Sequence, residues 1–250
     1  MKATAPMSMT LDITAVLLVG GMGTRLRSVA PSAPKPLASI GGQSFLELLI
    51  RQLRHQGIRR LVMCSGYLAD QIENKFGDGS PWDLTIEYSR EEKPLGTAGA
   101  LKLARRHLEE GPDFLVMNGD SFLETDFGGL LRFHHERHGL ASMAVVSVQN
   151  AGRYGTVHVD ASSRVIGFTE KTGSDAPGLI NAGLYVFSSA IFEHIPDGPV
   201  SLERDVFPRI LYRGVYALEQ SGMFIDIGTP QDYANAQVLC DQLTDAAFRR

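Results

Sequence analysis

A short apolar run that ends in glycines restricts most strongly what this chain can fold into. Residues 13–19 read I-T-A-V-L-L-V, and G-G-M-G follows at 20–23. A run with so little polar alternation is typical of a strand buried on both faces, as in a parallel sheet. Ligands of open α/β sheets bind at the carboxyl ends of the strands, so a binding site is expected at the glycines.

Signals for strands and helices alternate along the first half of the chain. Beyond the first strand, apolar spacing predicts strands at 58–64, 84–88 and 114–117, and helices at 44–57, 68–76, 97–108 and 127–138. Units of this kind build a mostly parallel sheet with helices on its faces. The predicted fold class is therefore α/β.

The spacing of these signals changes after residue 140. Strands are expected at 143–148, 156–159, 165–169 and 184–187, short helices near Ile191 and Leu202, and a closing helix at about 231–243. This half is expected to elaborate the edge of the sheet. No linker or repeat interrupts residues 1–250, so we predict one domain with two halves, about 13–140 and 141–250.

Composition restricts the partners and the location. The 250 residues are 44% hydrophobic, enough for a sizeable core, and the formal net charge is -4. This balance gives no field that would gather nucleic acid or anionic membrane, so small-molecule partners are expected. Cys64 and Cys240 lack zinc or CxxC spacing, and no apolar run suits a leader or a membrane span. We expect a cytoplasmic protein, either a monomer or a homo-oligomer.

The loop after the first strand has the residues of a phosphate site. It reads G-G-M-G-T-R-L at 20–26, and P-K-P follows at 34–36. Glycines let backbone N–H groups approach phosphates, while Arg25 and Lys35 add two cations. A dinucleotide-binding G-x-G-x-x-G is excluded because residue 26 is Leu, and a Walker A loop because the chain has no Gly-Lys pair.

This loop resembles the pyrophosphorylase loop of the sugar-1-phosphate nucleotidyltransferases, a Rossmann-like family. Further motifs follow in the family's order over nearly the whole chain: L-G-T-A-G-A at 95–100, N-G-D at 118–120, Y-G at 154–155, F-T-E-K at 168–171, N-A-G at 181–183 and F-I-D-I-G-T-P at 224–230. The resemblance implies a mostly parallel mixed sheet flanked by helices, with a nucleotide-binding first half and a sugar-binding second half. The implied reaction transfers a nucleoside monophosphate from a triphosphate to a sugar 1-phosphate and releases pyrophosphate.

Two aspartates are candidate metal ligands. Asp120 follows the strand at 114–117, and Asp226 ends a later apolar run, so both could lie at one edge of the sheet. By residue type alone, each could equally be a turn or helix-cap aspartate. The family resemblance assigns both to Mg2+, which takes hard oxygen ligands.

The resemblance also assigns the remaining site residues. Arg25 and Lys35 are expected on the triphosphate and Lys171 on the sugar phosphate, with no general base because the sugar phosphate oxygen is itself the nucleophile. The expected nucleotide-binding residues are Gly20, Gly21, Gly23, Thr24, Gly96 and Thr97, and the expected sugar-binding residues are Gly155, Glu170 and Asn181. Two alternatives stay open: Lys171 as a solvated lysine at a strand end, and Thr97 as a helix cap.

Two departures from the broad family favour one of its branches. R-S-V at 27–29 replaces the usual proline-containing continuation, and S-L-E-R-D-V-F-P occupies 201–208. This combination resembles the D-glycero-α-D-manno-heptose 1-phosphate guanylyltransferases, which implies GTP as the nucleotide. Mannose 1-phosphate guanylyltransferases and the uridylyl- or thymidylyltransferases of other hexose 1-phosphates are the competing interpretations.

An interpretation of another class is a catalytically silent nucleotide-sugar sensor or regulatory subunit. Such relatives usually lose a phosphate-handling residue, and none is missing from the motifs above.

Zinc is not expected either. H-H-E-R-H at 134–138 fails the H-E-x-x-H spacing because residue 139 is Gly, and a polar outer helix face explains His134 and His138 better.

Overall fold

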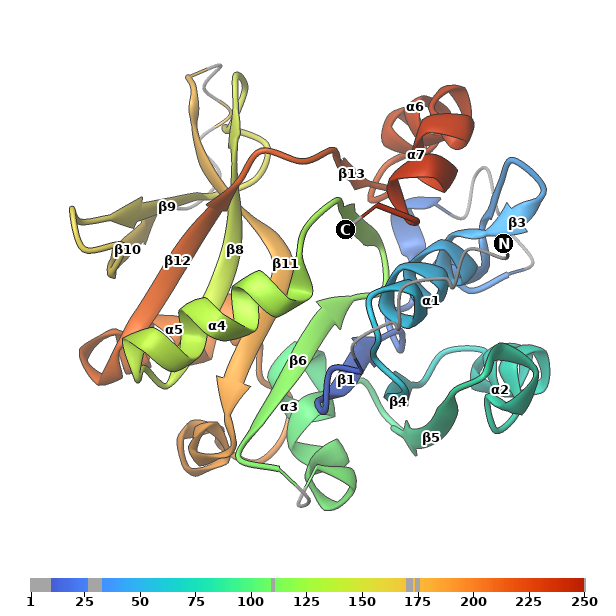
Figure 1. Cartoon of the computed structure of the whole chain (residues 1–250), viewed down its shortest axis with the longest axis horizontal. Helices are drawn as coiled ribbons and strands as arrows, with labels where there is room; N and C mark the ends of the chain where they lie inside the picture. The colour runs from blue at the N-terminus through green and yellow to red at the C-terminus, as the bar shows by residue number, and fades with distance from the viewer. Residues whose placement is uncertain (1–9, 27–32, 109–110, 170–172, 174–175, 250) are drawn as a thin grey trace, which may run out of the picture.

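The computed structural model describes residues 10–26, 33–108, 111–169, 173 and 176–249 (Figure 1). Its centre is a nine-stranded mixed sheet ordered β10-β9-β11-β6-β1-β4-β5, in which β8 pairs with β11 and β12 pairs with β8. Four neighbouring strands run parallel: β6 (Asp113–Asn118), β1 (Thr14–Leu18), β4 (Arg60–Ser65) and β5 (Thr85–Arg90). The predicted α/β class and the first-half strands are confirmed.

The second half of the chain continues the same sheet. β11 (Gly178–Ser188) pairs antiparallel with both β6 and β8 (Ala141–Val148), and β12 (Val215–Gln220) runs parallel to β8. A hairpin of β9 (Thr156–Val159) and β10 (Val165–Thr169) joins β11 through β9. The expected elaboration at the sheet edge is therefore an extension of the sheet itself, and both halves share one framework.

Helices cover both faces of the sheet (Figure 1). Hydrophobic residues of α1 (Phe45–His55), α2 (Ala69–Phe76), α4 (Phe127–Arg137), α6 (Pro230–Val238) and α7 (Cys240–Ala246) join one buried cluster. Those of α3 (Gly96–Leu103) and α5 (Phe207–Ile210) join the other. Among the described residues, none of the helices combines the length and apolar content needed to cross a bilayer.

Shorter elements complete the chain. Hairpin strands β2 (Ser39–Ile40) and β3 (Gln43–Ser44) precede α1, and β7 (Ser121–Leu123) pairs antiparallel with β13 (Phe224–Asp226). Single 3-10 segments occupy Thr24–Leu26, Lys35–Leu37, Ser80–Trp82, Ala104–His107, Ser189–His194 and Leu211–Arg213, and Leu202–Val206 is π-helical.

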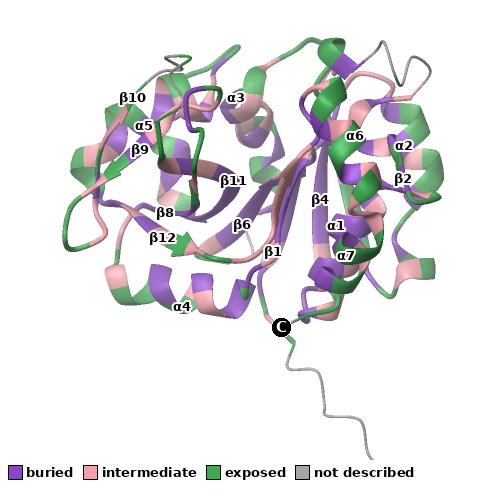
Figure 2. Ribbon diagram, turned by 90° about the horizontal axis from the view of Figure 1, so that it is seen from above, coloured by how far each residue is buried: buried purple, intermediate pink, exposed green. Residues whose placement is uncertain are grey.

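The two-sided burial of the sheet explains the apolar run in the sequence. Along β1, Ala15 and Leu17 enter one hydrophobic cluster while Val16 enters the other. Successive residues of a strand point to opposite faces, so a strand with helices on both sides needs apolar residues at every position. Figure 2 shows these strands as buried ribbon between helices whose outer faces are exposed.

Three features differ from the sequence-based expectations. β12 was not anticipated, because it alternates buried and half-buried residues and ends in Glu219 and Gln220. The closing helix is two helices, since Leu239 interrupts it with φ -97° and ψ 13°. His134 does not lie on an outer face: it is 3% exposed, and its ring contacts the Ser142 hydroxyl at 3.0 Å.

Two buried glutamines, Gln52 in α1 and Gln56 directly after it, hold the segment between β7 and α4. Gln52 Nε2 donates to the Leu123 carbonyl at 2.7 Å. Gln56 Nε2 donates to the Thr125 carbonyl at 2.7 Å, and its Oε1 accepts from the Phe127 N–H at 2.8 Å. Each amide thus satisfies backbone groups that would otherwise be buried without a partner.

Replacing Gln56 should test how much this support contributes to stability. Gln56→Leu leaves the two backbone groups without their partner, so we expect the free energy of unfolding to fall by about 2 kcal/mol. Urea denaturation of the variant would measure the loss. Gln149→Leu, at an exposed position, is the matched control, and an equal loss in both variants would contradict the assignment.

Candidate functional site

A cavity of about 360 Å³ lies at the carboxyl ends of the parallel strands. It opens where β1, β4 and β6 end, as expected for an open α/β sheet. Its lining includes many of the residues singled out from the sequence, namely Gly20, Gly21, Gly23, Thr24, Arg25, Lys35, Gly96, Thr97 and Asp120. The structure therefore brings the glycine loop, its two cations, the start of α3 and one candidate metal ligand together.

Two glycines of this lining cannot be replaced without strain. Gly23 has φ +56°, and a Cβ there would lie 2.8 Å from the Cβ of Lys35. Gly96, at the start of α3, has φ +70°, and a Cβ there would lie 2.6 Å from the carbonyl oxygen of Val200. These glycines let the loop and the helix approach neighbouring segments closely, which narrows the cavity around a ligand.

Lys35 forms an ion pair with Asp120 inside the cavity. Its side chain is 10% exposed and that of Asp120 is 34% exposed. Lys35 begins a 3-10 turn after Pro34, while Asp120 directly follows β6 and Gly119. Arg25, by contrast, is exposed at the rim. The cation predicted for the triphosphate thus also neutralises a candidate metal ligand.

Asp120 and Asp226 lie close together although they come from distant parts of the chain. Ser121, the residue after Asp120, lies beside Asp226, and 105 positions separate these two. Pairing of β7 with β13 places Ser121 opposite Asp226, and the Ile227 N–H donates to the Asp120 carbonyl at 2.9 Å. The Ser121 hydroxyl lies 3.4 Å from an oxygen of each carboxylate. Burial, reinforced by the negative charge of Asp120, raises the pKa of Asp226.

This carboxylate pair fits a divalent cation. Two hard oxygen groups, both partly buried, would be stabilised in ionised form by a cation between them. Within the described ranges there is no group of three or more His, Cys, Asp or Glu side chains that could hold a metal. Magnesium is commonly held by one or two carboxylates together with substrate phosphates, so two protein ligands suffice.

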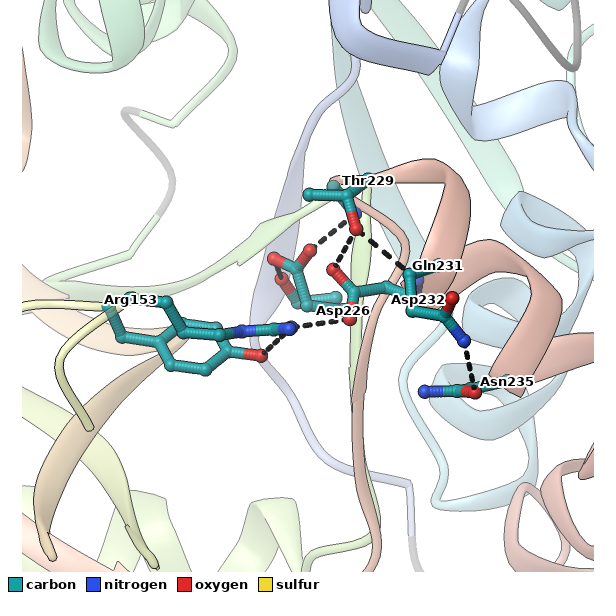
Figure 3. Close-up of polar contacts among 9 residues, drawn as sticks. Arg153, Asp226, Thr229, Gln231, Asp232 and Asn235 are labelled. Atoms are coloured by element: carbon teal, nitrogen blue, oxygen red, sulfur yellow. Dashed lines mark hydrogen bonds and ion pairs between the residues drawn. The ribbon is translucent and has the colours of Figure 1, made fainter. Parts of the chain in front are cut away.

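A second acidic residue lies behind Asp226 and ties it to the loop before β9. Asp232, 7% exposed, accepts from the Thr229 hydroxyl at 2.7 Å and forms an ion pair with Arg153. Arg153 also donates to the Tyr154 hydroxyl at 2.7 Å. Figure 3 shows the Arg153 guanidinium reaching Asp232 while Asp226 and Thr229 lie beside it. The loop that bears Tyr154 and Gly155 is thus joined to the segment that follows Asp226.

The residues assigned to the sugar lie apart from the lining of this cavity. Asn181, on β11, donates from Nδ2 to the Tyr185 hydroxyl at 2.8 Å and accepts from the Gly183 N–H at 3.0 Å. Gly155 lies immediately before β9. Glu170 and Lys171 lie outside the described residues, so their predicted roles stay predictions.

Thr97 lines the cavity, but its hydroxyl is used elsewhere. It donates to Glu203 at 2.9 Å and accepts from the Leu202 N–H at 2.8 Å, and it makes no capping bond to α3. The capping alternative is therefore wrong. The Thr97 hydroxyl therefore has no proton left to donate to a nucleotide, and a contact would use its remaining lone pair, its backbone or its methyl group.

Glu91 belongs to the cavity and was not anticipated from the sequence. It follows β5 as Asp120 follows β6, a placement that could have drawn attention to it. Its Oε2 accepts from the Leu95 N–H at 2.9 Å. A Cβ at Gly20 or Gly66 would lie 2.9 or 2.7 Å from Oε1, so these glycines leave room for the carboxylate. Burial raises the pKa of Glu91.

Known proteins share this sequence pattern. The model of the nucleotidyl transferase family matches residues 14–242. The chain is 38% identical over 228 residues to a mannose-1-phosphate guanylyltransferase of Mycobacterium tuberculosis, covering 90% of this chain and 63% of that protein. It is 38% identical over 225 residues to a D-glycero-alpha-D-manno-heptose 1-phosphate guanylyltransferase of Aneurinibacillus thermoaerophilus, covering 89% of this chain and 96% of that protein.

A solved structure agrees with these sequence matches. HddC from Yersinia pseudotuberculosis, crystallised with GMP-PN, has a TM-score of 0.81 and 34% identity, and the match covers 90% of this chain and 98% of that one. The chain spans less than two thirds of the mannose enzyme and nearly all of HddC. From its fold, its glycine loop and a family match that runs from β1 into α7, the chain belongs to the nucleotidyl transferase family.

Proposed function

We propose that this protein transfers a nucleoside monophosphate from a nucleoside triphosphate to a sugar 1-phosphate and releases pyrophosphate. The observation that carries the proposal is the meeting of Asp120, Asp226 and Lys35 at a cavity floored by the glycine loop. The one thiol in the described lining, Cys64, is buried, and burial raises its pKa to about 12, so it stays protonated and is a poor nucleophile. Such a site suits a reaction in which the substrates supply both the attacking and the leaving oxygens.

In this reaction an oxygen of the sugar phosphate attacks the α-phosphorus, and the bond to the β-phosphate oxygen breaks as pyrophosphate leaves. Backbone N–H groups of the glycine loop, with Arg25 and Lys35, hold the triphosphate and stabilise the charge that develops on the leaving group. Asp120 and Asp226 would hold Mg2+, which neutralises phosphate charge when bound. Lys171 is proposed for the sugar phosphate.

GTP is the proposed nucleotide, and Glu91 supports it. Guanine presents two adjacent donors, N1–H and the N2 amino group, and an ionised carboxylate accepts from both. Glu91 is the glutamate that lines the nucleotide cavity, and one of its oxygens makes no hydrogen bond with any described residue. HddC, similar along nearly its whole length, was crystallised with the guanine nucleotide analogue GMP-PN.

D-glycero-α-D-manno-heptose 1-phosphate is the proposed sugar substrate. The heptose 1-phosphate enzyme of Aneurinibacillus thermoaerophilus aligns over 96% of its length, whereas the mannose enzyme of the same identity is longer. Mannose 1-phosphate is the competing substrate, followed by other hexose 1-phosphates with UTP or dTTP. Arg25, Lys35 and Asp120, which are proposed to act on the phosphates and the metal, line one cavity, and this supports an enzyme over a silent sensor.

A substrate grid is the direct test of the proposed function. The grid combines GTP, ATP, CTP, UTP and dTTP with the 1-phosphates of heptose, mannose, glucose and N-acetylglucosamine, in the presence of magnesium. We expect pyrophosphate release to be fastest for GTP with the manno-heptose 1-phosphate. A different best pair would retain the reaction and discard the heptose. Silence across the grid with folded protein would discard the reaction.

Replacing Asp226 should separate stability from activity. Asp226→Asn removes a partly buried charge beside Asp120, so without metal the variant should unfold at the wild-type temperature or above it. Its turnover should fall at least roughly a hundredfold because a metal ligand is lost. Calorimetry measures the unfolding temperature, and pyrophosphate release measures the turnover. Asp245→Asn, at an exposed position, is the control. Near-native turnover would refute the metal assignment.

Replacing Glu91 should change the choice of base. Glu91→Gln presents one acceptor and one donor, which no longer matches the two donors of guanine but matches the N3–H and carbonyl of uracil or thymine. We expect kcat/KM for GTP to fall at least roughly tenfold relative to UTP. The adjacent exposed Glu92→Gln is the control. An unchanged ratio of GTP to UTP activity would show that Glu91 does not read the base.

A further inference from the structure

The carboxylate of Glu203 accepts hydrogen bonds from three hydroxyls, two of which lie on other elements, α3 and β11. It lies on the π-helical turn Leu202–Val206, within the motif at 201–208 that the reaction itself leaves unexplained. Oε2 accepts from the Thr97 hydroxyl at 2.9 Å and from the Ser201 hydroxyl at 2.8 Å. Oε1 accepts from the hydroxyl of Tyr185, on β11, at 3.4 Å.

These bonds connect the two sides of the proposed site. Thr97 belongs to the start of α3, which lines the nucleotide cavity. Tyr185 accepts from Asn181 Nδ2 at 2.8 Å, and Asn181 is the residue proposed for the sugar. A continuous series of side chains, Thr97, Glu203, Tyr185 and Asn181, therefore runs from the nucleotide side to the sugar side.

The direction of each hydrogen bond in this series is fixed by chemistry. An ionised carboxylate only accepts, so Tyr185 must use its single proton on Glu203 and can only accept from Asn181. Tyr185 is fully buried, and its burial together with the charge of Glu203 raises the pKa of its hydroxyl well above the usual value, so the proton is retained. Asn181 must then turn its amino group toward Tyr185.

The backbone imposes the same orientation on Asn181 from its other side. The Gly183 N–H donates to Oδ1 of Asn181 at 3.0 Å. With both amide ends held, Asn181 keeps one N–H and one lone pair in set directions for a ligand. In Glu203→Gln the side chain has one acceptor end and one donor end. With the amino group toward Tyr185, the tyrosine proton could be accepted only if Asn181 turned over and gave up Gly183; with the amino group toward Thr97 and Ser201, the bonds that these two hydroxyls donate are lost.

We infer that Glu203 is a positioning residue, which holds the start of α3 on the nucleotide side and orients Asn181 on the sugar side through one carboxylate. The inference rests on the proposed function, because it takes the start of α3 and Asn181 as substrate-binding elements. Glu203 touches neither substrate in this account. Its effect on binding passes through Thr97 in one direction and through Tyr185 in the other.

Three substitutions test this arrangement by their effect on each substrate separately. Glu203→Gln should raise KM for at least one of the two substrates by about five- to tenfold, the loss of one hydrogen bond, because its single amide oxygen can accept from only one branch. Tyr185→Phe cuts the branch to Asn181 and should raise KM for the sugar 1-phosphate alone. Thr97→Val cuts the branch to α3, together with the bond from the Leu202 N–H, and should raise KM for the triphosphate alone. Exposed Glu193→Gln should match the wild type.

The measurement is steady-state pyrophosphate release with each substrate varied in turn, together with thermal unfolding of every variant. Wild-type values of both KM in Glu203→Gln would overturn the inference, as would equal increases in both KM in Tyr185→Phe, which indicate general loosening. If Glu203→Gln does not fold, Tyr185→Phe and Thr97→Val decide the question, because each should raise KM for a different substrate.

Failure of the proposed reaction is distinguishable from failure of this inference. A wild-type protein that releases no pyrophosphate with any substrate pair refutes the reaction alone. Titration calorimetry then measures the binding of GTP and of mannose 1-phosphate to the wild type and the three variants. We expect Thr97→Val to weaken the binding of GTP and Tyr185→Phe to weaken the binding of the sugar phosphate. Affinities that do not change with Glu203→Gln would overturn the positioning role.

Discussion

The repulsion between two carboxylates at the end of β6 is the constraint on which this site depends. Asp226 lies partly buried beside Asp120, and both the partial burial and the neighbouring charge oppose its ionisation. The pairing of β7 with β13 nevertheless holds the two residues together, and Lys35 supplies the one cation that contacts Asp120 within the described part of the chain. A fold that enforces such an arrangement concentrates negative charge where a divalent cation would be stabilised.

The shared sheet makes that arrangement rigid from both sides. β6 leads directly into Asp120 and also pairs with β11, the strand that bears Asn181. The nucleotide side and the proposed sugar side are therefore held by adjacent strands of one hydrogen-bonded ladder, not by two bodies in loose contact. Preorganised groups lose little free energy to reorganisation when charge develops, which is the main contribution a protein makes to phosphoryl-type transfer.

Sequence reasoning succeeded where the physical signal was local and failed where it was not. The strand at 13–19, the glycine loop and the place of Asp120 follow from an apolar run and the residues next to it. The partnership of Asp120 with Asp226 needed the family resemblance. Glu203 and Thr97 are 106 positions apart, and no periodicity in the sequence marks their hydrogen bond. β12 was missed although its first four residues, V-Y-A-L, are apolar, because a run this short does not by itself distinguish a strand from a loop.

Charge balance explains why the site needs more than its own side chains. When both are ionised, Asp120 and Asp226 carry two negative charges against the one positive charge of Lys35, and Glu91 is a second carboxylate beside Asp120 in the cavity lining. A triphosphate and a sugar phosphate bring further negative charge into the same partly enclosed space, where screening by water is weak. Arg25 at the rim offsets only part of it. A divalent cation would offset part of the remaining negative charge, which supports the proposed magnesium.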